Sequence, residues 1–412
     1  MLYLNNMEIQ GTINRFLPFA ILYFFFNSLF LPIGLLYTTL LTPLFLYWIY
    51  QQSMMKYIWF FFLVTLPLAC IHFLYGVNFQ SYFKSYLLLF SAFIFGVSFY
   101  LFLKKSNTIR LIFDKLIVWN FLLALVALGL LFLGIRDIFW YQEPISAGIT
   151  DVPRLKMFTY EASYYSLLMV PLVLYYYLKV LLLKTAQPFL KTVLVTLPLI
   201  LSFSFGVLLG LGLSMFFLFW SDIKLFFVKK RFPRYILVAG LLLLLVFIML
   251  VKFYPENPVF KRFANVFEGN DSSFKGRTTD SFFLGWRMAS MKSILFGCGL
   301  GQIRELGLET FTNFYNHPFT TNTINIPNSL GETLAMYGIL GLFARLGIEI
   351  YLFFKTRVYS NYYRISLYLF VFIYQFTGSF LNNIAEYVLW ILAFTPVFFE
   401  FDKKSIRSNL NL

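Results

Sequence analysis

Apolar residues fill runs of about 20 positions that recur along the whole chain, separated by polar segments. A helix of that length crosses roughly 30 Å of hydrocarbon and satisfies its own backbone hydrogen bonds there. The runs lack the alternation of apolar and polar residues that the strands of a membrane barrel require. The pattern therefore predicts an all-α, polytopic integral membrane protein with about twelve transmembrane helices.

The expected spans divide the chain into three parts. Residues 1–253 hold transmembrane helices 1–9 with a short extracytoplasmic loop at 135–159, residues 254–327 form a large extracytoplasmic loop, and residues 328–412 hold helices 10–12 and a cytoplasmic tail. Because long loops without a task are uncommon, we expect 254–327 to fold as a cap, with a short amphipathic helix near 280–296. A mobile solvated loop is the alternative. The spans are expected near 13–31, 33–50, 57–75, 82–103, 111–134, 160–181, 190–204, 205–221, 235–253, 328–354, 362–380 and 384–400.

The chain is 60% hydrophobic, only 12% of its residues are charged, and its formal net charge is +15. With both termini in the cytoplasm, the basic residues gather in the cytoplasmic connections, as the positive-inside rule requires. The charge therefore reflects topology and contact with anionic lipid, and it does not indicate a nucleic-acid partner. The residues concerned include Lys104, Lys105, Arg110, Lys179, Lys184, Lys191, Lys229, Lys230, Arg231, Arg234, Lys355, Arg357, Arg364, Lys403, Lys404 and Arg407.

Cysteine and histidine are rare in the chain. Cys70 lies in an expected span and Cys298 in the large loop, and there are only two histidines. These residues are too few and too scattered for a disulfide framework or a metal-ligand cluster, so we expect no metal and no cofactor. The first apolar run continues past Pro32 into the second and lacks a small-residue cleavage pattern, so we expect it to be retained as a span.

Two charged residues mark the entry to the expected span at 160–181. Arg154 is expected just outside the membrane, on the side that the positive-inside rule leaves poor in basic residues. Its guanidinium suits a phosphate or a carboxylate of a ligand. The alternative is a pair with Asp151 or with lipid headgroups. Thr159 is placed to cap the helix, and Glu161 would fall in the first turn, where the helix dipole favours an anion. The Glu161 carboxylate could instead orient the arginines or act as a base.

The large loop offers further candidates for binding. Arg277 lies among small polar residues, and Arg287 lies on the expected amphipathic helix, where a solvated face is the alternative. Gly297, Gly299 and Gly301 let the backbone approach a ligand or turn tightly. A dinucleotide site is excluded as an interpretation, because no strand precedes these glycines.

Asn328 begins the segment that follows the large loop. It is a natural N-cap for the span at 328–354, whose positive end could hold an anionic lipid phosphate. Gly338 and Gly341 would allow close helix packing. Arg345 and Glu349, four residues apart, are expected to pair with each other.

Taken in order, these motifs resemble the O-antigen polymerase (Wzy-type) and O-antigen ligase superfamily over the second half of the chain. Two departures stand out. The chain has Glu161-Ala162-Ser163 where the family commonly has Glu-Pro-Ser, and Pro327 where ligases carry a histidine directly before Asn-Ser, so a polymerase is favoured. The matching positions are Arg154, Phe158, Glu161, Ser163, Arg277, Gly297, Gly299, Gly301, Asn328, Ser329, Gly338 and Gly341.

The resemblance implies a metal-independent glycosyltransferase of lipopolysaccharide or other polysaccharide biosynthesis in the bacterial inner (plasma) membrane. It would join undecaprenyl-pyrophosphate-linked oligosaccharide repeat units on the outer face, in contact with membrane lipid and with the flippase and chain-length regulator of the same pathway. The alternatives are an O-antigen ligase and a lipid-linked oligosaccharide flippase, the second disfavoured by the few charges within the spans and the lack of a repeat. The expected catalytic residues are Arg154, Glu161 and Arg277, and the expected substrate-binding residues are Arg287, Gly297, Gly299, Gly301 and Asn328.

Overall fold

A computed structural model describes residues 37–105, 109–142, 152–183, 188–221, 258–269, 271–321 and 323–408. The expected spans at 13–31 and 235–253 lie outside these residues, as do Asp151 and the basic residues of 229–234. Within the described ranges the chain is predominantly helical, and the strands there are the two-residue β1 (Trp140–Tyr141) and β2 (Arg154–Leu155). The prediction of a helical protein is confirmed for these residues.

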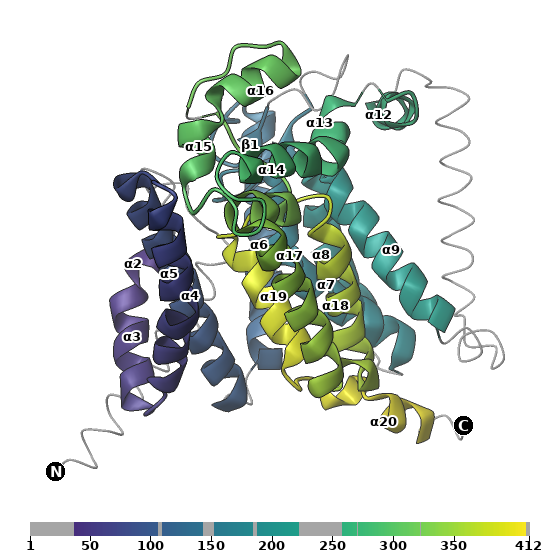
Figure 1. Cartoon of the computed structure of the whole chain (residues 1–412). Coiled ribbons are helices and arrows are strands. Elements are labelled where there is room, and N and C mark those ends of the chain that lie inside the picture. The colour runs from purple at the N-terminus through teal and green to yellow at the C-terminus, as the bar shows by residue number, and fades with distance from the viewer. Residues whose placement is uncertain are drawn as a thin grey trace.

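The apolar helices run side by side in one bundle (Figure 1). Five of the described helices, α4, α5, α6, α7 and α17, are long and apolar enough to cross a membrane, and α8, α9, α18 and α19 contain shorter apolar stretches. The bundle contains α2 (Tyr37–Leu40), α3 (Thr42–Gln51), α4 (Lys56–Leu74), α5 (Phe79–Lys105), α6 (Ile109–Phe132), α7 (Ala162–Leu182), α8 (Pro188–Leu201), α9 (Phe205–Ser221), α17 (Ser329–Lys355), α18 (Tyr362–Tyr374) and α19 (Ile384–Phe394).

The described residues between 258 and 327, which we call the cap, form short helices at one end of the bundle (Figure 1). They are α12 (Pro258–Phe267), α13 (Ser272–Lys275), the π-helix η2 (Gly276–Asp280), α14 (Ser281–Ser290), α15 (Gln302–Leu306) and α16 (Leu308–Tyr315). α14 packs against α17, and α12 lies across the direction of the bundle helices. The opposite end carries η3 (Val358–Ser360), η4 (Phe399–Phe401) and α20 (Lys403–Ser408).

α7 lies at the centre of the bundle and is buried along almost its whole length. It packs against α8, α9, α18 and α19, and its Tyr165, Tyr175 and Tyr176 side chains are fully buried in the main core. A second core lies under the cap, where Met288 and Ile303 meet Tyr82 of α5. The cap is therefore packed onto the membrane helices and is not a loose loop.

α18 and α19 are both shorter than the spans expected at 362–380 and 384–400. α18 ends at Tyr374, and α19 ends at Phe394 because Pro396 disfavours a helical conformation at the residue before it. Between the two helices the backbone turns, with Ser379 in the left-handed region at φ +71°. Residues 375–383 are therefore an irregular segment at the capped end of the bundle.

α17 is broken at Gly338, whose φ of +67° and ψ of −165° are not helical. Where a helix is interrupted, backbone amides and carbonyls on either side of the break lose their hydrogen-bonding partners within the helix. The cap loop at 294–299 supplies new partners by running alongside the break. Cys298 N and Gly299 N donate to the carbonyls of Ala335 and Met336 (2.8 and 3.0 Å), while Ile339 N and Leu340 N donate to those of Ile294 and Leu295 (3.0 and 3.2 Å).

Candidate functional site

A pocket opens at the capped end of the bundle, where the ends of α7 and α18 and the segment before α19 meet η2. It encloses about 320 Å³ of empty space, part of which is open to the outside. Its polar lining residues are Glu161, Ser163, Arg277, Ser379 and Asn383. The remaining lining residues are Tyr160, Tyr164, Leu167, Pro327, Tyr374 and Phe380.

Glu161 and Arg277 meet in this pocket although they lie in different parts of the chain. Nη2 of Arg277 is 3.5 Å from Oε1 of Glu161, and their side chains are 32% and 23% exposed. Arg277 lies in the π-helix η2, a type of distortion that is frequent at functional sites. The pocket therefore presents a cation and an anion that solvent can reach.

Glu161 occupies the N-cap position of α7, which begins at Ala162. The prediction that Thr159 caps this helix is wrong, because its hydroxyl donates to the carbonyls of Lys156 and Glu161 (2.6 and 2.9 Å). The Glu161 carboxylate makes no capping hydrogen bond either and accepts one from Ser163 Oγ. The side chain of Glu161 therefore faces the pocket instead of stabilising the helix end.

Arg154 lies behind the pocket and is not one of its lining residues. Its Nε donates to the carbonyl of Ser202 (3.3 Å) between α8 and α9, and its guanidinium lies 5.9 Å from the centre of the Tyr141 ring. The side chain is buried, which lowers the pKa of Arg154; Glu161 opposes the shift, and the nearby positive charges of Arg262 and Arg277 add to it. Arg154 thus lies within electrostatic reach of both Glu161 and Arg277.

Arg262 of α12 is a third arginine in this group, and the sequence reasoning missed it. Its Nε lies 3.3 Å from Oδ2 of the buried Asp271, and its guanidinium lies 5.3 Å from the centre of the Phe205 ring. Burial lowers the pKa of Arg262, with Asp271 opposing and Arg277 adding to the shift. The group thus contains three guanidinium groups and two carboxylates, and its net charge is positive. Its members are Arg154, Arg262, Arg277, Glu161 and Asp271. The only sequence signal for Arg262 was its place in an expected extracytoplasmic loop, where the positive-inside rule predicts few basic residues. No motif surrounds it.

Gly297, Gly299 and Gly301 do not line the pocket. All three have positive φ, and a Cβ at Gly297 would overlap the backbone of α17, while one at Gly301 would overlap the backbone of Ser81 in α5. At Gly299 a Cβ would come within 3.1 Å of Val77 Cγ1. These glycines let the cap loop pack tightly against the membrane helices, which accounts for them without a ligand.

Asn328 is the N-cap of α17, as predicted. Its Oδ1 accepts from Leu330 N and Gly331 N (3.0 and 2.9 Å). Its Nδ2 donates to the carbonyl of Arg277 (2.8 Å) and also to that of Phe376. The amides at the helix start thus have protein acceptors, and the Asn328 side chain holds the backbone of Arg277 in place.

Arg287 lies on the exposed face of α14, outside the pocket lining. Its guanidinium lies 4.6 Å from the centre of the Phe283 ring on the same helix. The structure therefore places Arg287 on a solvated helix face, apart from Arg277 and Glu161. Its role in binding substrate stays a prediction.

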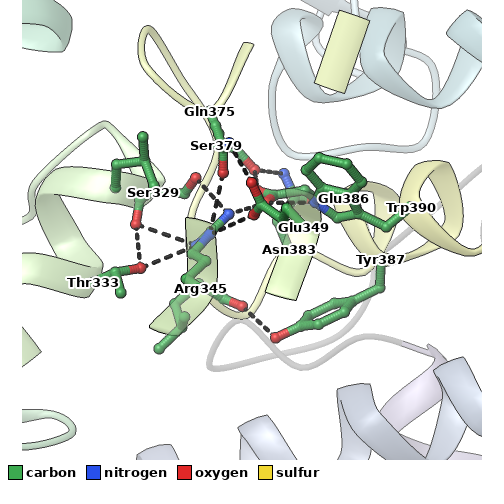
Figure 2. Close-up of polar contacts among 12 residues, drawn as sticks. Ser329, Thr333, Arg345, Glu349, Gln375, Ser379, Asn383, Glu386, Tyr387 and Trp390 are labelled. Atoms are coloured by element: carbon green, nitrogen blue, oxygen red, sulfur yellow. Dashed lines mark hydrogen bonds and ion pairs between the residues drawn. The ribbon is translucent and has the colours of Figure 1, made fainter. Parts of the chain in front are cut away.

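A network of buried charged side chains joins α17 and α19 (Figure 2). The predicted pair is present, with Arg345 Nε 3.2 Å from Glu349 Oε1. Arg345 also pairs with Glu386 of α19, a partner that the sequence reasoning missed. Glu386 in turn accepts a hydrogen bond from Ser379 Oγ (2.5 Å), a residue of the pocket wall. The network therefore reaches the pocket through Ser379.

No family model matches the chain, and no curated protein matches it. Among the described residues no group of three or more His, Cys, Asp or Glu side chains is arranged to hold a metal ion. The function must therefore be argued from the geometry of the site.

Proposed function

We propose that the chain is a membrane glycosyltransferase of the O-antigen polymerase type, which joins undecaprenyl-pyrophosphate-linked repeat units on the outer face of the bacterial inner membrane. The observation that carries the proposal is the pocket in which Arg277 meets Glu161, with Arg154 and Arg262 within electrostatic reach. A surplus of partly buried guanidinium groups suits a ligand with several negative charges, such as a lipid pyrophosphate.

The orientation in the membrane supports an outer-face site. The end of the bundle opposite the cap carries Lys104 and Lys105 at the end of α5, Lys355 at the end of α17, and Lys403 and Lys404 in α20. We therefore place that end and both termini in the cytoplasm, with about twelve spans in all. The cap and its pocket then face outward, where lipid-linked repeat units are joined.

The reaction would use the arginines to stabilise the leaving group. The hydroxyl oxygen of the acceptor sugar bonds to the anomeric carbon of the donor glycan, and the bond from that carbon to the phosphate oxygen breaks. The lipid pyrophosphate departs with the electron pair, so negative charge grows on it in the transition state. Guanidinium groups that are already in place stabilise this charge more than they stabilise the bound substrate, which accelerates the reaction.

Pro327 favours polymerase over ligase. It lines the pocket at the position where ligases carry a histidine, and it has no group that can exchange a proton. The two histidines of the chain lie elsewhere: His72 is buried in α4 with Nε2 2.8 Å from the carbonyl of Phe296, and His317 packs against Phe319 after α16. Neither lines the pocket.

Replacement of Arg277 tests the proposal in cells that carry the chain's own glycan locus. Deleting the gene should leave a single repeat unit on the lipid A core, and the wild-type gene should restore the ladder of long chains on a gel. Arg277→Ala should lower the rate by about 10²–10³, as loss of one preorganised donor does in other enzymes, and should abolish long chains. Arg277→Lys should restore them only in part, because a lysine keeps the charge without the forked donor geometry.

The matched control is Arg304→Ala, which removes an exposed arginine of α15 outside the pocket and should leave the ladder unchanged at equal protein level. Loss of the single-unit band on deletion would identify a ligase or a flippase and overturn the proposal. A normal ladder from Arg277→Ala would remove this arginine from the mechanism.

A further inference from the structure

Ser379 is an unusual residue in the pocket wall. It is nearly buried, and its φ of +71° is a conformation that side chains other than glycine rarely adopt. Its hydroxyl donates to Oε2 of Glu386 (2.5 Å), and its oxygen accepts from Nδ2 of Asn383 (3.0 Å). A hydroxyl oxygen has two lone pairs, so Ser379 can still accept one hydrogen bond, and the pocket is on its open side.

Glu386 is held firmly behind Ser379. Its Oε1 pairs with Arg345 and accepts from Trp390 Nε1 (3.3 Å), while Oε2 faces Ser379 (Figure 2). Asn383, which caps α19 through Ala385 N (3.0 Å), fixes the start of the helix that carries Glu386. The direction in which Glu386 Oε2 points is therefore set by three hydrogen-bonding partners of the carboxylate, Arg345, Trp390 and Ser379.

The network contains more negative than positive charge. Glu386 and Glu349 share the single guanidinium of Arg345, and Gln375, the remaining partner of Glu349 (2.7 Å), is neutral. Glu332 lies close enough to interact electrostatically with Arg345 and Glu386. Arg345 pairs with Oε1 of Glu386, so Oε2 is the oxygen that faces the Ser379 hydroxyl and is positioned to accept a proton from it.

We propose that Ser379 binds the attacking hydroxyl of the acceptor sugar and passes its proton to Glu386. This inference rests on the proposed glycosyl transfer and names the residues that remove the proton. Glu161 was the sequence-based candidate for the base; its Oε1 faces both Arg277 and Ser163, whereas Glu386 uses Oε1 for Arg345 and keeps Oε2 for Ser379. Ser379 is then a catalytic residue, and Glu386 acts through it.

The proposed step is balanced without any further reactant. The acceptor O–H proton moves to Ser379 Oγ as the acceptor oxygen bonds to the anomeric carbon, and the Ser379 proton moves to Glu386 Oε2. The lipid pyrophosphate leaves with the electron pair of the broken bond. Glu386 returns its proton to solvent by the reverse path once the product has left the pocket.

Ser379→Gly separates this role from a structural one. Glycine suits the left-handed backbone at this position, which offsets part of the stability lost with the two hydrogen bonds of the hydroxyl, so the variant should still fold. The turnover number for elongation of lipid-linked repeat units in proteoliposomes should fall about 10²-fold or more, with the KM for the donor nearly unchanged. Ser53→Gly is the matched control, because Ser53 also has a positive φ (+55°) but lies between α3 and α4 at the opposite end of the bundle.

Glu386→Gln completes the test, since it keeps the shape of the side chain but cannot take the proton. It should lower the turnover number by a similar factor per folded molecule. The turnover number of the double variant with Ser379→Gly should be no lower than that of the less active single variant. Two residues that act in series show this non-additivity, whereas two independent structural defects multiply. Full elongation by folded Ser379→Gly, or multiplied losses, would overturn the relay and leave the proposed function standing. A wild-type protein that does not elongate would overturn both.

Discussion

Asn328 links the start of α17 to Arg277 through a single side chain. Its carbonyl oxygen caps α17, and its amide nitrogen donates to the backbone of Arg277 and to the segment after α18. The residue therefore has two separable effects, one on the stability of the helix end and one on the position of Arg277. Asn361 is a useful comparison, because its side chain caps α18 at the end of the bundle opposite the cap.

Asn328→Ala should lower both stability and activity. Loss of the cap and of the amide donor should lower the free energy of unfolding by about 1–3 kcal/mol. Asn361→Ala loses a cap and the hydrogen bonds to Phe398 and Asp402, so its stability loss should be similar. Thermal unfolding in detergent and chain-length gels measure the two effects. Only Asn328→Ala should shorten the chains per folded molecule, and equal chain lengths from the two variants would contradict a positioning role.

The residues of the site differ in how far the sequence could identify them. Arg277 and Glu161 could be named because Arg277 lies in the expected large loop, Glu161 lies at the very start of an expected span, and both lie in motifs that resemble a known family. Ser379 and Glu386 could not, because both fall inside apolar runs whose lengths predicted continuous spans. Hydropathy records how apolar a segment is, but it does not record where a helix stops or which buried side chains meet from different helices.

The break in α17 is the clearest case at the level of elements. The apolar run across Gly338 predicted one continuous span, whereas the structure joins two helical pieces through a segment that the cap loop completes. Irregular backbone at such a place is stable only when protein groups satisfy it. The glycines at 297, 299 and 301 belong to the same arrangement, because they let the cap loop lie close to α17 and α5.

Gly338→Ala should destabilise the protein strongly. A side chain at φ +67° and ψ −165° is strained, and the added Cβ would overlap the backbone of Leu295. We expect a loss of at least about 1–3 kcal/mol from the strain alone. Gly347→Ala is the matched control in the same helix, because its Cβ would meet nothing within 4 Å and alanine favours a helix. Thermal unfolding of both variants in detergent should separate them, and equal unfolding temperatures would show that the break is not required.

The uneven distribution of basic residues along the molecule is the basis for the proposed orientation in the membrane. Labelling with a membrane-impermeant maleimide in right-side-out membrane vesicles tests it. Thr320→Cys in the cap should react from outside, and Lys404→Cys in α20 should react only after detergent is added, because both positions are exposed but lie at opposite ends. Both variants carry Cys70→Ser, because Cys70 is an exposed free cysteine of α4. Cys298 is buried and burial raises the pKa of its thiol to about 12, so this thiol stays protonated and should not compete. The reverse labelling pattern would place the pocket in the cytoplasm and contradict the proposed function.

The helical class of the molecule followed from run length alone, and the positions of α4 to α9 and α17 lie close to the spans expected there. The folded state of the cap was expected from its length, but its contacts could not be derived. They depend on pairs far apart in the chain, such as Gln302 with the backbone of Asn78 (2.9 and 3.1 Å). Local sequence patterns carry no information on such pairs, which also decide where Arg154 and Arg262 lie relative to Arg277.

The pairing of Arg345 with two carboxylates also bears on how the nascent chain enters the bilayer. α17 leaves the ribosome before α19, so Arg345 enters the bilayer with partners from its own helix alone: the carboxylate of Glu349, one turn away, and the hydroxyls of Ser329 and Thr333. An isolated charge in mid-membrane raises the cost of insertion by about 2.5–3.5 kcal/mol, and a partner on the same helix reduces that cost. Glu386 enters the membrane later, with α19, and then forms an ion pair with the guanidinium of Arg345. Arg345 thus pairs with Glu349 while α17 inserts and with Glu386 when α19 packs against it.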